Sequence, residues 1–515
     1  MTKRKRNRKK IILHPVMTFI ILILIVIFVS GILSIFNISV NYNSISSSGN
    51  DLLLSTESIN NLFSLRGIKY IFSNTVTNFA NFTVLSHLII VLIGIGVMEY
   101  SGFLKVAVGL LTKHAKKRTI TYVIVLISIL ASIVDNLPFI AFLPLAALIF
   151  KYGKRNPQIG IVACYAGLTC GYGLSLLFTS IDSQLASVTM GAAKLLDQSF
   201  NFGAFSMILI MLVAVIILSF IITYITENYL VLEVPKYEFE ETEVFSDNEL
   251  TKNQLKGLVL SGLGSAAYLI IFIYNIIPGL PFSGNFLNYS EKIYIDKLFG
   301  VNSFFANGFV FIITMLFIIS GLLYGIGSKS IKDNREFVES LGHSLNGIGK
   351  VLVFVFASAT FISIFKQTNI GNVLIAFFAR IISSSSFSGL ALVLLTFVLT
   401  AIGTLLVPNS LLKWNILAYS IVPKFMDVGI SAQFAQIVYR FGECVTLGLT
   451  PVFAYFIVYI ALLNKYSQDE YSFSMRTPIK YMVPYALSTA GVMLAIIILW
   501  YIIGLPLGIG ASVAI

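Results

Sequence analysis

The chain has 515 residues, of which 57% are hydrophobic and only 11% are charged, and its mean hydropathy is +0.89. This composition excludes a soluble globular protein and indicates an all-α polytopic membrane protein. The net charge of +12 comes in large part from residues 1–15. A basic segment directly before an apolar helix anchors topology at anionic lipid far more often than it binds nucleic acid.

The first half of the chain, residues 16–228, begins with an apolar stretch at 16–36. This stretch is too long for the core of a signal peptide and is predicted to be the first transmembrane helix. Residues 1–15 then form a basic cytoplasmic tail, because segments rich in Lys and Arg stay in the cytoplasm. The polar segment 37–83 is expected outside, and 84–111 returns. We therefore expect a multi-pass protein of the plasma membrane with a cytoplasmic N-terminus.

The apolar stretch 119–150 lies between two basic clusters, at 113–118 and 151–155, and is broken midway by Asp135-Asn136-Leu137-Pro138. Both ends are therefore expected on the cytoplasmic side, but two full crossings would need roughly 20 residues each. A re-entrant helical hairpin satisfies both conditions. Its tip would expose backbone groups at membrane depth, which is tolerated only inside protein or beside a water-filled cavity, where transporters bind solutes.

The crossing that begins near Ile159 is predicted to unwind part-way, because Gly167, Gly171 and Gly173 precede the polar sequence Thr179–Asp182. A span at 205–225 completes the first half. The next segment, 229–256, is acidic and poor in apolar residues, so it is predicted to be a cytoplasmic connector.

The second half, residues 257–470, has crossings predicted at 258–277, 304–326 and 350–366, and a second interrupted apolar stretch at 389–422. This stretch is broken at Gly403 and at Pro408-Asn409-Ser410, and the distribution of Lys and Arg places both its ends outside. It is therefore a hairpin opposed to the first. Each hairpin is followed by a turn and a glycine-containing helix, as in two halves of inverted topology. Residues 471–515 contain the final transmembrane helix.

Ionisable side chains at membrane depth are candidates for function, because each costs about 2.5 to 3.5 kcal/mol to insert. They are Asp135, Asp182, Lys413, Arg440 and Glu443. Asp135 and Asn136 either cap the half-helices, with Pro138 in the first helical turn, or bind an ion, and the two roles are compatible. The segment Thr179–Asp182 offers hydroxyls, a carboxylate and freed carbonyls, which are the ligands that sodium prefers.

Arg440 and Glu443 are spaced i, i+3 on one helix and are close enough to pair. The pair is either a structural salt bridge or part of a site in which Arg440 faces a carboxylate-bearing solute. Lys413, next to Trp414, either snorkels to the interface or lies inside the protein just past the second hairpin tip. Three cysteines and four histidines are scattered and form no metal-ligand spacing.

Several short motifs, in order along the whole chain, resemble those of the p-aminobenzoyl-glutamate transporter (AbgT) family. They are Gly94-Ile-Gly-Val-Met-Glu99-Tyr-Ser-Gly102, Leu143–Phe150, Ile181-Asp182, Thr226-Glu227, Asn369-Ile-Gly371, Lys413-Trp414, Val422-Pro423, Tyr439-Arg440-x-Gly442 and Thr450-Pro451. The resemblance implies a homodimer whose protomers each have nine transmembrane helices and two opposed hairpins. It also implies transport of p-aminobenzoyl-glutamate-like solutes or export of antimetabolites, driven by sodium or protons.

The chain departs from the family pattern at the sites themselves. The family's Ser-Asp-Ala-Gly-Tyr at the first tip is here Asp135–Phe139, and its Ser-Ala-Ser-Ala before Lys-Trp is Asn409–Leu412. The family's Arg-x-Gly-Asp-Ser becomes Arg440–Cys444, and the Asn expected before Thr-Pro is absent. These changes indicate a divergent branch in which substrate and coupling ion do not carry over from the family.

We therefore expect a cation-coupled secondary transporter of a small organic anion, p-aminobenzoyl-glutamate-like or an antimetabolite, that works by alternating access. The expected substrate-binding residues are Asn136, Pro138, Asn369, Gly371, Asn409, Ser410, Trp414, Arg440 and Pro451. The expected ion-coupling residues are Asp135, Asp182 and Glu443, with sodium possible at Asp182. No cofactor is expected beyond sodium or a proton, and the expected partners are the organic anion, membrane lipid and a second copy of the chain.

Three alternatives stay open at this point: a membrane-embedded enzyme or lipid-carrier handling protein, a transporter of an unrelated anion, and a passive channel. The enzyme interpretation is disfavoured because the sequence offers no nucleophile-base pair and no metal ligands at one face. The channel is disfavoured because inverted hairpins suit alternating access.

Overall fold

The computed structural model describes residues 13–45, 52–113, 115–134, 136–174, 176, 178–239, 250–300, 302–468 and 474–515. Most of the predicted basic tail, Asp135, and residues 240–249 of the predicted connector therefore lie outside the described residues. The predictions made for them stay predictions.

Within the described part of the chain, nine helical segments are long and apolar enough to cross a membrane, which confirms the all-helical membrane architecture. The segments are α1 (Pro15–Ile35), α2 with α3 (Leu65–Ala80, Thr83–Tyr100), α5 with η1 (Lys117–Leu130, Ala131–Val134), α9 continued by η2 and α10 (Ile208–Ile225, Thr226–Leu230, Val231–Glu233), α11 (Lys252–Ile276), α13 (Phe304–Ser328), α15 (Ile348–Thr368), α19 with η5 and α20 (Ala432–Thr446, Leu447–Leu449, Ala454–Lys465) and α21 (Arg476–Ile503).

The set of spans differs at one place from the predicted set. The limb α5 with η1 is long enough to count as a span, whereas α7 (Pro157–Cys170), which was expected to cross, is shorter. The cause is local: Gly171 caps α7, and the described residues between it and Thr179, the N-cap of α8 (Ser180–Ala193), are not helical. The predicted unwinding of this crossing is therefore present, and it starts soon after the helix is established.

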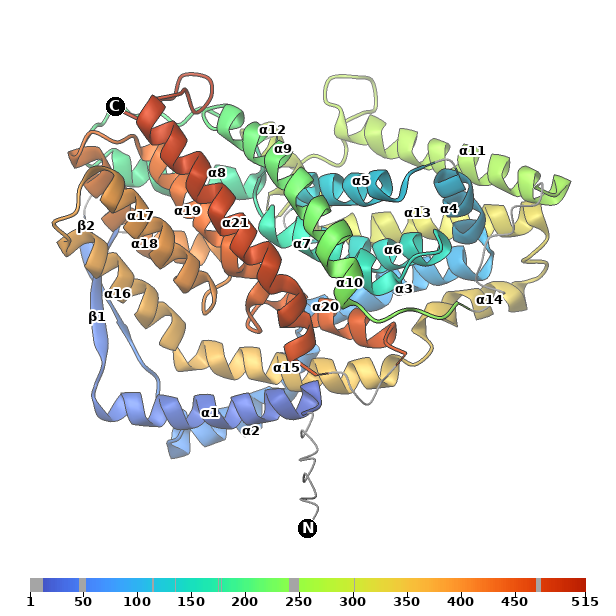
Figure 1. Cartoon of the computed structure of the whole chain (residues 1–515), viewed down its shortest axis with the longest axis horizontal. Coiled ribbons are helices and arrows are strands. Elements are labelled where there is room, and N and C mark those ends of the chain that lie inside the picture. Colours follow the sequence, from blue (N-terminus) through green and yellow to red (C-terminus); the bar gives the residue numbers. More distant parts are fainter. Residues whose placement is uncertain are drawn as a thin grey trace, which may run out of the picture.

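The polar segment 37–83, for which the sequence predicted a side of the membrane but no secondary structure, contains regular elements. Strands β1 (Ser39–Ile45) and β2 (Leu52–Ser58) form an antiparallel pair in which Ser39 lies opposite Ser58, and α2 follows. The strands pack against α16 (Ile370–Ser384) and α18 (Ser410–Asp427), as Figure 1 shows at the left of the molecule. The alternation of Val40 and Tyr42 with polar residues is the local signal for β1.

Two helical hairpins form at the predicted positions. The first consists of α5, η1 and α6 (Pro138–Tyr152), and the second of α17 (Gly389–Thr404) and α18. Local chemistry sets the start of each returning limb: Pro138 occupies the first turn of α6, and the Asn409 side chain accepts a hydrogen bond from the backbone of Leu412 at the start of α18.

Each hairpin packs on a broken helix of its own half, and the second part of that broken helix packs on the other hairpin. Helix α7 lies against α5 and α6, whereas α8 lies against α18; helix α19 lies against α17, whereas α20 lies against α6. The break after α7 also meets the last turn of α19, because the Cys444 thiol lies 3.2 Å from the carbonyl oxygen of Tyr172. This exchange of partners joins both halves around one centre.

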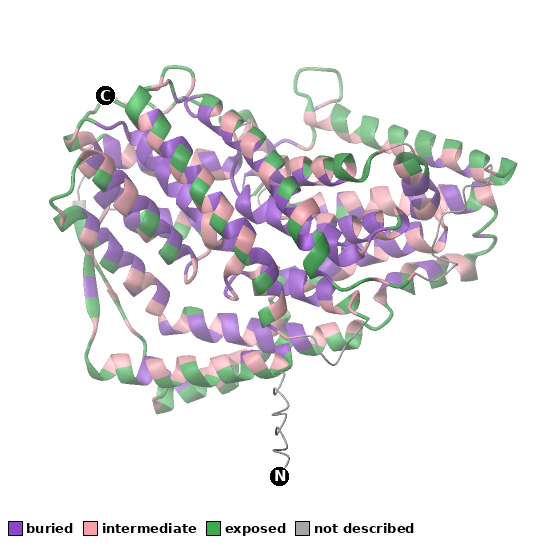
Figure 2. Ribbon diagram, viewed as in Figure 1, coloured by how far each residue is buried: buried purple, intermediate pink, exposed green. Residues whose placement is uncertain are grey.

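The remaining helices surround that centre. On one side lie α3, α4 (Phe103–Lys113), α11, α13, α14 (Asn334–Gly342) and η4 (His343–Leu345), and on the other α1, α2 and α15 (Figure 1). The short helix α12 (Tyr294–Phe299) contacts both α13 and α8. Burial follows this order (Figure 2). Every residue of α7 is buried, but in α11 only Gly257 and Ser261 are. The apolar outer surfaces of α1 and α11 thus suit contact with lipid.

Candidate functional site

Four charged side chains meet where the two halves join, and we call them the ionic cluster. Lys413 comes from α18, Arg440 and Glu443 from α19, and Asp182 from α8. Lys413 and Arg440 are fully buried, Glu443 is 1% exposed and Asp182 is 5% exposed. Two positive and two negative charges balance, which a buried ionic site requires, because an unpaired charge in the interior costs several kcal/mol.

Lys413 ties the two limbs of the second hairpin together. Its ammonium lies 2.9 Å from Oε1 of Glu443 and donates hydrogen bonds to Oγ1 of Thr404 (2.6 Å) and to the carbonyl oxygen of Val407 (3.2 Å). Of the two placements considered for this lysine, the interior one is therefore present and the snorkelling one is not.

Glu443 receives more donors than any simple salt bridge would provide. Oε2 accepts a hydrogen bond from Oγ of Ser410 (2.7 Å) and lies 3.4 Å from Nη1 of Arg440, as the i, i+3 spacing predicted. Oε1 accepts from the hydroxyl of Tyr439 (2.9 Å). Together with the Lys413 ammonium, these donors fix the position of the carboxylate.

Arg440 fits into a space that only glycine leaves open. Gly173 has φ +72°, and a Cβ built on it would lie 1.5 Å from Nη2 of Arg440. The guanidinium reaches Oδ1 of Asp182 (3.4 Å) through Nη2 and lies 5.4 Å from the ring centroid of Tyr172. Its buried Nε has no hydrogen-bond partner among the described residues, so one donor of the cluster is unused.

Asp182 has a structural role beside its charge. Its Oδ2 accepts hydrogen bonds from the backbone N–H (3.1 Å) and the hydroxyl (2.6 Å) of Thr179, and together they form the capping box that starts α8. Within the described ranges, no group of three or more His, Cys, Asp or Glu side chains is placed to hold a metal ion. A cation at Asp182 would therefore rely on hydroxyl and carbonyl oxygens.

A cavity of about 760 Å³ adjoins the ionic cluster, and we call it the central cavity. It is lined by both hairpin tips, by the first turn of α8, by the junction of α15 with α16 and by residues 452–454. Ser410 and Tyr172 line the cavity and also contact the cluster. A ligand in the cavity would therefore be separated from Glu443 and Arg440 by single side chains.

The predicted site residues divide into three groups. Those that line the central cavity are Asn136, Asn369, Gly371, Asn409 and Ser410. Those in the ionic cluster are Asp182, Arg440 and Glu443. Those that do neither are Pro138, Trp414 and Pro451, and Asp135 lies outside the described residues.

Trp414 does not line the central cavity but packs against Tyr439, next to the ionic cluster. Its ring centroid is 4.4 Å from that of Tyr439, and its indole N–H donates to Oγ1 of Thr189 (3.0 Å). Pro138 is buried at the start of α6, and Pro451 directly precedes Val452, which does line the cavity. These three residues support the site without facing the cavity.

Asn369 couples the central cavity to the β-hairpin. Its side-chain amide donates to Oε2 of Glu57 (2.6 Å) and to the carbonyl oxygen of Ser58 (2.9 Å), and its backbone adopts the left-handed conformation between α15 and α16. Residues far apart in the sequence are thereby fixed at the cavity wall.

Sequence reasoning left Lys413, Tyr172 and Thr404 out of the predicted site residues. Lys413 carried a signal, because a lysine just past a hairpin tip has no short route to water. Tyr172 lies between Gly171 and Gly173 in the predicted unwound segment, but nothing local indicates that it faces Arg440. Thr404 gave no signal.

The chain was compared with known proteins and matches, over residues 7–515, the family described as "AbgT putative transporter family". It is 25% identical over 497 residues to the p-aminobenzoyl-glutamate transport protein of Escherichia coli K12, covering 96% of this chain and 94% of that protein. Among solved structures, the YdaH transporter of Alcanivorax borkumensis is 23% identical and covers 96% and 100% of the two chains, with a TM-score of 0.47. MtrF of Neisseria gonorrhoeae, placed in a class of antimetabolite efflux pumps, is 27% identical and covers 98% of both, with the same TM-score of 0.47.

Proposed function

The chain belongs to the AbgT putative transporter family, and from that premise we propose that it is a cation-coupled secondary transporter that carries a small organic anion by alternating access. Membership makes it a multi-pass membrane transporter and not an enzyme. The proposed substrate is p-aminobenzoyl-glutamate or a similar aromatic acid, by analogy with the name of the Escherichia coli relative, or an antimetabolite, as the family resemblance implies.

The observation that carries the proposal is the contact between the central cavity and the ionic cluster through Ser410. This hydroxyl donates to Glu443 at 2.7 Å and lies 3.3 Å from Nη1 of Arg440, while the residue itself lines the cavity. If the Ser410 side chain rotated away, a substrate carboxylate could occupy the position of this hydroxyl and contact Arg440 directly. Arg forms the strongest and most oriented hydrogen bonds with carboxylates.

Charge balance then provides the coupling. The cluster is neutral without substrate, so an entering carboxylate leaves one negative charge in excess in a buried site. The excess is removed when Glu443 binds a proton or when a sodium ion binds near Asp182 and Thr179, because a buried uncompensated charge costs several kcal/mol. Substrate and cation therefore stabilise each other in the same conformation, which is the thermodynamic requirement for coupled transport.

Alternating access would use the exchanged packing of the two hairpins. Since α8 packs on α18 and α20 packs on α6, movement of one hairpin tip changes the wall that the other half presents to the central cavity. The interruptions after α7, at Gly171, and after α19, at residues 447–453, supply the joints at which short segments rotate without disrupting whole helices. We further propose that the protein works as a homodimer with its N-terminus in the cytoplasm.

The test is uptake of labelled p-aminobenzoyl-glutamate by the purified protein in liposomes, with sodium and proton gradients imposed separately. Uptake that follows one gradient identifies the coupling ion. Glu443→Gln keeps the shape of the side chain but not its charge, and it should lower gradient-driven uptake at least tenfold while the protein elutes as folded material. Glu291→Gln, in an exposed loop, is the matched control and should transport normally.

Two results would contradict the proposal. Full gradient-driven uptake by Glu443→Gln would remove the carboxylate from the coupling step. Absence of uptake under both gradients, in wild type and control alike, would mean that the altered hairpin tips have changed the substrate, and unrelated organic anions would be tested next.

A further inference from the structure

A second cavity lies outside the central one, between β1, β2, α16 and α18, and we call it the hairpin pocket. Its volume is about 400 Å³, within the usual range for sites that bind small molecules. Among the described residues that line it, Arg380 is the only charged side chain, Leu54 and the ring of Tyr42 are apolar, and the others are Ser and Asn. The pocket therefore combines one positive charge with a polar wall.

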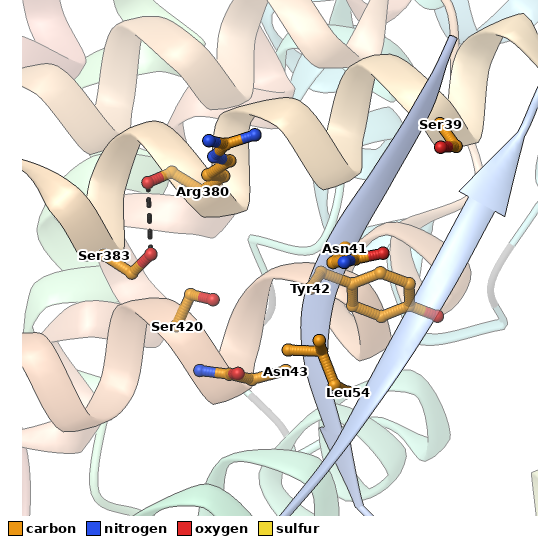
Figure 3. Close-up of a pocket in the computed structure, with 8 residues that line it drawn as sticks. All are labelled: Ser39, Asn41, Tyr42, Asn43, Leu54, Arg380, Ser383 and Ser420. Atoms are coloured by element: carbon orange, nitrogen blue, oxygen red, sulfur yellow. Dashed lines mark hydrogen bonds between the residues drawn. The ribbon is translucent and has the colours of Figure 1, made fainter. Parts of the chain in front are cut away.

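Three polar side chains around this pocket have unused hydrogen-bonding capacity. The guanidinium of Arg380, the amide of Asn43 and the hydroxyl of Ser420 come from α16, β1 and α18 and line the same pocket. In Figure 3, Ser420 and Asn43 lie next to each other, and Arg380 lies across the pocket from them. Within the described part of the chain, none of these three side chains makes a hydrogen bond or an ion pair. The backbone carbonyl of Arg380 accepts hydrogen bonds from the hydroxyls of Ser383 (3.1 Å) and Ser384, and these bonds do not involve its guanidinium.

This set of groups fits the oxygen atoms of an anion. A guanidinium presents a fork of N–H donors that matches a carboxylate, and an amide and a hydroxyl add neutral donors at its sides. Ser420 is 5% exposed, so the floor of the pocket is shielded, whereas Arg380 and Asn41 are exposed at its mouth. An oxyanion can therefore enter from solvent and meet a partly desolvated wall, where ionic contacts are stronger than in water.

The position of the pocket links it to the transport site. Ser420 lies ten residues after Ser410 on α18, which is about 15 Å along one helix, and Arg380 lies on α16, whose first turn lines the central cavity at Gly371. The serine run at 383–386 spans the C-terminal end of α16 and indicates an aqueous rather than a lipid environment. Both cavities thus share the walls α16 and α18.

We propose that the hairpin pocket is a second oxyanion-binding site, in which Arg380 with Asn43 and Ser420 binds a carboxylate of the transported solute outside the central cavity. The identity of this solute rests on the proposed function. The site itself does not, because Arg380 and its neighbours would bind a carboxylate whether or not the central cavity transports it.

The test is equilibrium binding of labelled p-aminobenzoyl-glutamate to the full-length protein in phosphatidylcholine nanodiscs. Wild type should bind two equivalents per chain. Arg380→Gln should weaken one of them by roughly 10- to 100-fold, as expected for loss of hydrogen bonds from a charged donor, and leave the other unchanged. Arg66→Gln removes an arginine from the exposed surface of α2, outside the pocket, and should retain both.

A second variant separates this proposal from the proposed function. Ser410→Ala alters only the central cavity. It should weaken binding of p-aminobenzoyl-glutamate there, and the equivalent that this variant still binds should be lost when Arg380→Gln is added. If the proposed function is wrong, wild type should bind one equivalent, of p-aminobenzoyl-glutamate or of free glutamate, and Arg380→Gln should lose it. Binding of both probes that is the same in wild type and Arg380→Gln would overturn the hairpin pocket.

The lipid composition of the discs distinguishes a soluble carboxylate from a lipid phosphate. In discs of phosphatidylglycerol, persistence of the Arg380-dependent equivalent supports a site for solute. Its loss in these discs, with recovery in phosphatidylcholine, would assign the pocket to anionic headgroups and overturn the assignment to solute.

Discussion

At the scale of single residues, the ionic cluster depends on what its neighbours leave unoccupied as much as on its charges. Gly173 provides the space for the guanidinium of Arg440, and its positive φ is a conformation that residues with a Cβ rarely adopt. The break that follows α7 therefore also provides the space that the buried guanidinium of Arg440 occupies.

Gly173→Ala should both strain the backbone and displace Arg440 from Asp182. The backbone term alone is of order 1 to 3 kcal/mol, and loss of the buried ion pair adds to it. Thermal unfolding in detergent should show a clear loss of stability, and liposome uptake should fall at least tenfold.

Gly429→Ala is the matched control, because Gly429 has φ +78° but nothing within 4 Å of the position that an added Cβ would take. Gly429→Ala should lose only the stability that backbone strain costs, and its uptake should equal that of wild type. If Gly173→Ala and Gly429→Ala lost the same stability and the same uptake, displacement of Arg440 would have no effect of its own.

At the scale of elements, close approach of helices sets the position of each hairpin. A Cβ on Gly442 of α19 would lie 2.8 Å from the carbonyl oxygen of Phe397 on α17, and one on Gly160 of α7 would lie 2.5 Å from that of Ala146 on α6. Backbone atoms of a hairpin limb thus rest directly on the broken helix in both halves. Small residues at such crossings allow this contact in membrane proteins.

Gly442→Ala should separate α17 from α19 and destabilise the protein by about 1 to 3 kcal/mol, the usual cost of overpacking. Gly491 lies within α21, and no atom lies within 4 Å of the position that an added Cβ would take. Gly491→Ala should therefore stabilise the protein by up to about 1 kcal/mol, because Ala has a higher helix propensity than Gly. Thermal unfolding of the two variants measures both effects. A neutral Gly442→Ala would show that the hairpin is free to move away from α19.

At the scale of the whole molecule, the proposed inverted topology places the two hairpins on opposite sides of the membrane. The described cysteines, Cys164, Cys170 and Cys444, are all buried, so thiol reagents should find little background. Exposed single cysteines can therefore report sidedness directly.

Ser384→Cys, at the C-terminal end of α16, should react with a membrane-impermeant maleimide in intact cells, since this end of α16 is expected outside. Arg335→Cys, in α14, should react only after permeabilisation, because it lies among the Lys and Arg residues that indicate the cytoplasm. Both residues are exposed, so accessibility does not limit labelling. The reverse pattern would invert the proposed orientation, and labelling of both from one side would refute opposed hairpins.

The sequence by itself determined the spans, the two hairpins with their breaks, and the pairing of Arg440 with Glu443. These features depend on apolar length, on proline, glycine and capping residues, and on helical spacing, all of which act within a few turns of chain. The same local signals overestimated α7, because they set where a helix is apolar but not where its hydrogen bonds stop.

Only the tertiary structure decided which charges share one site. Lys413 pairs with Glu443 on the next helix, Arg440 with Asp182 of the other half, and Ser410 joins this cluster to the central cavity. The hairpin pocket likewise needs β1, α16 and α18 together. Such contacts arise from packing between segments distant in sequence, where a buried charge selects its partner by position in space, and no local pattern of residues encodes that position.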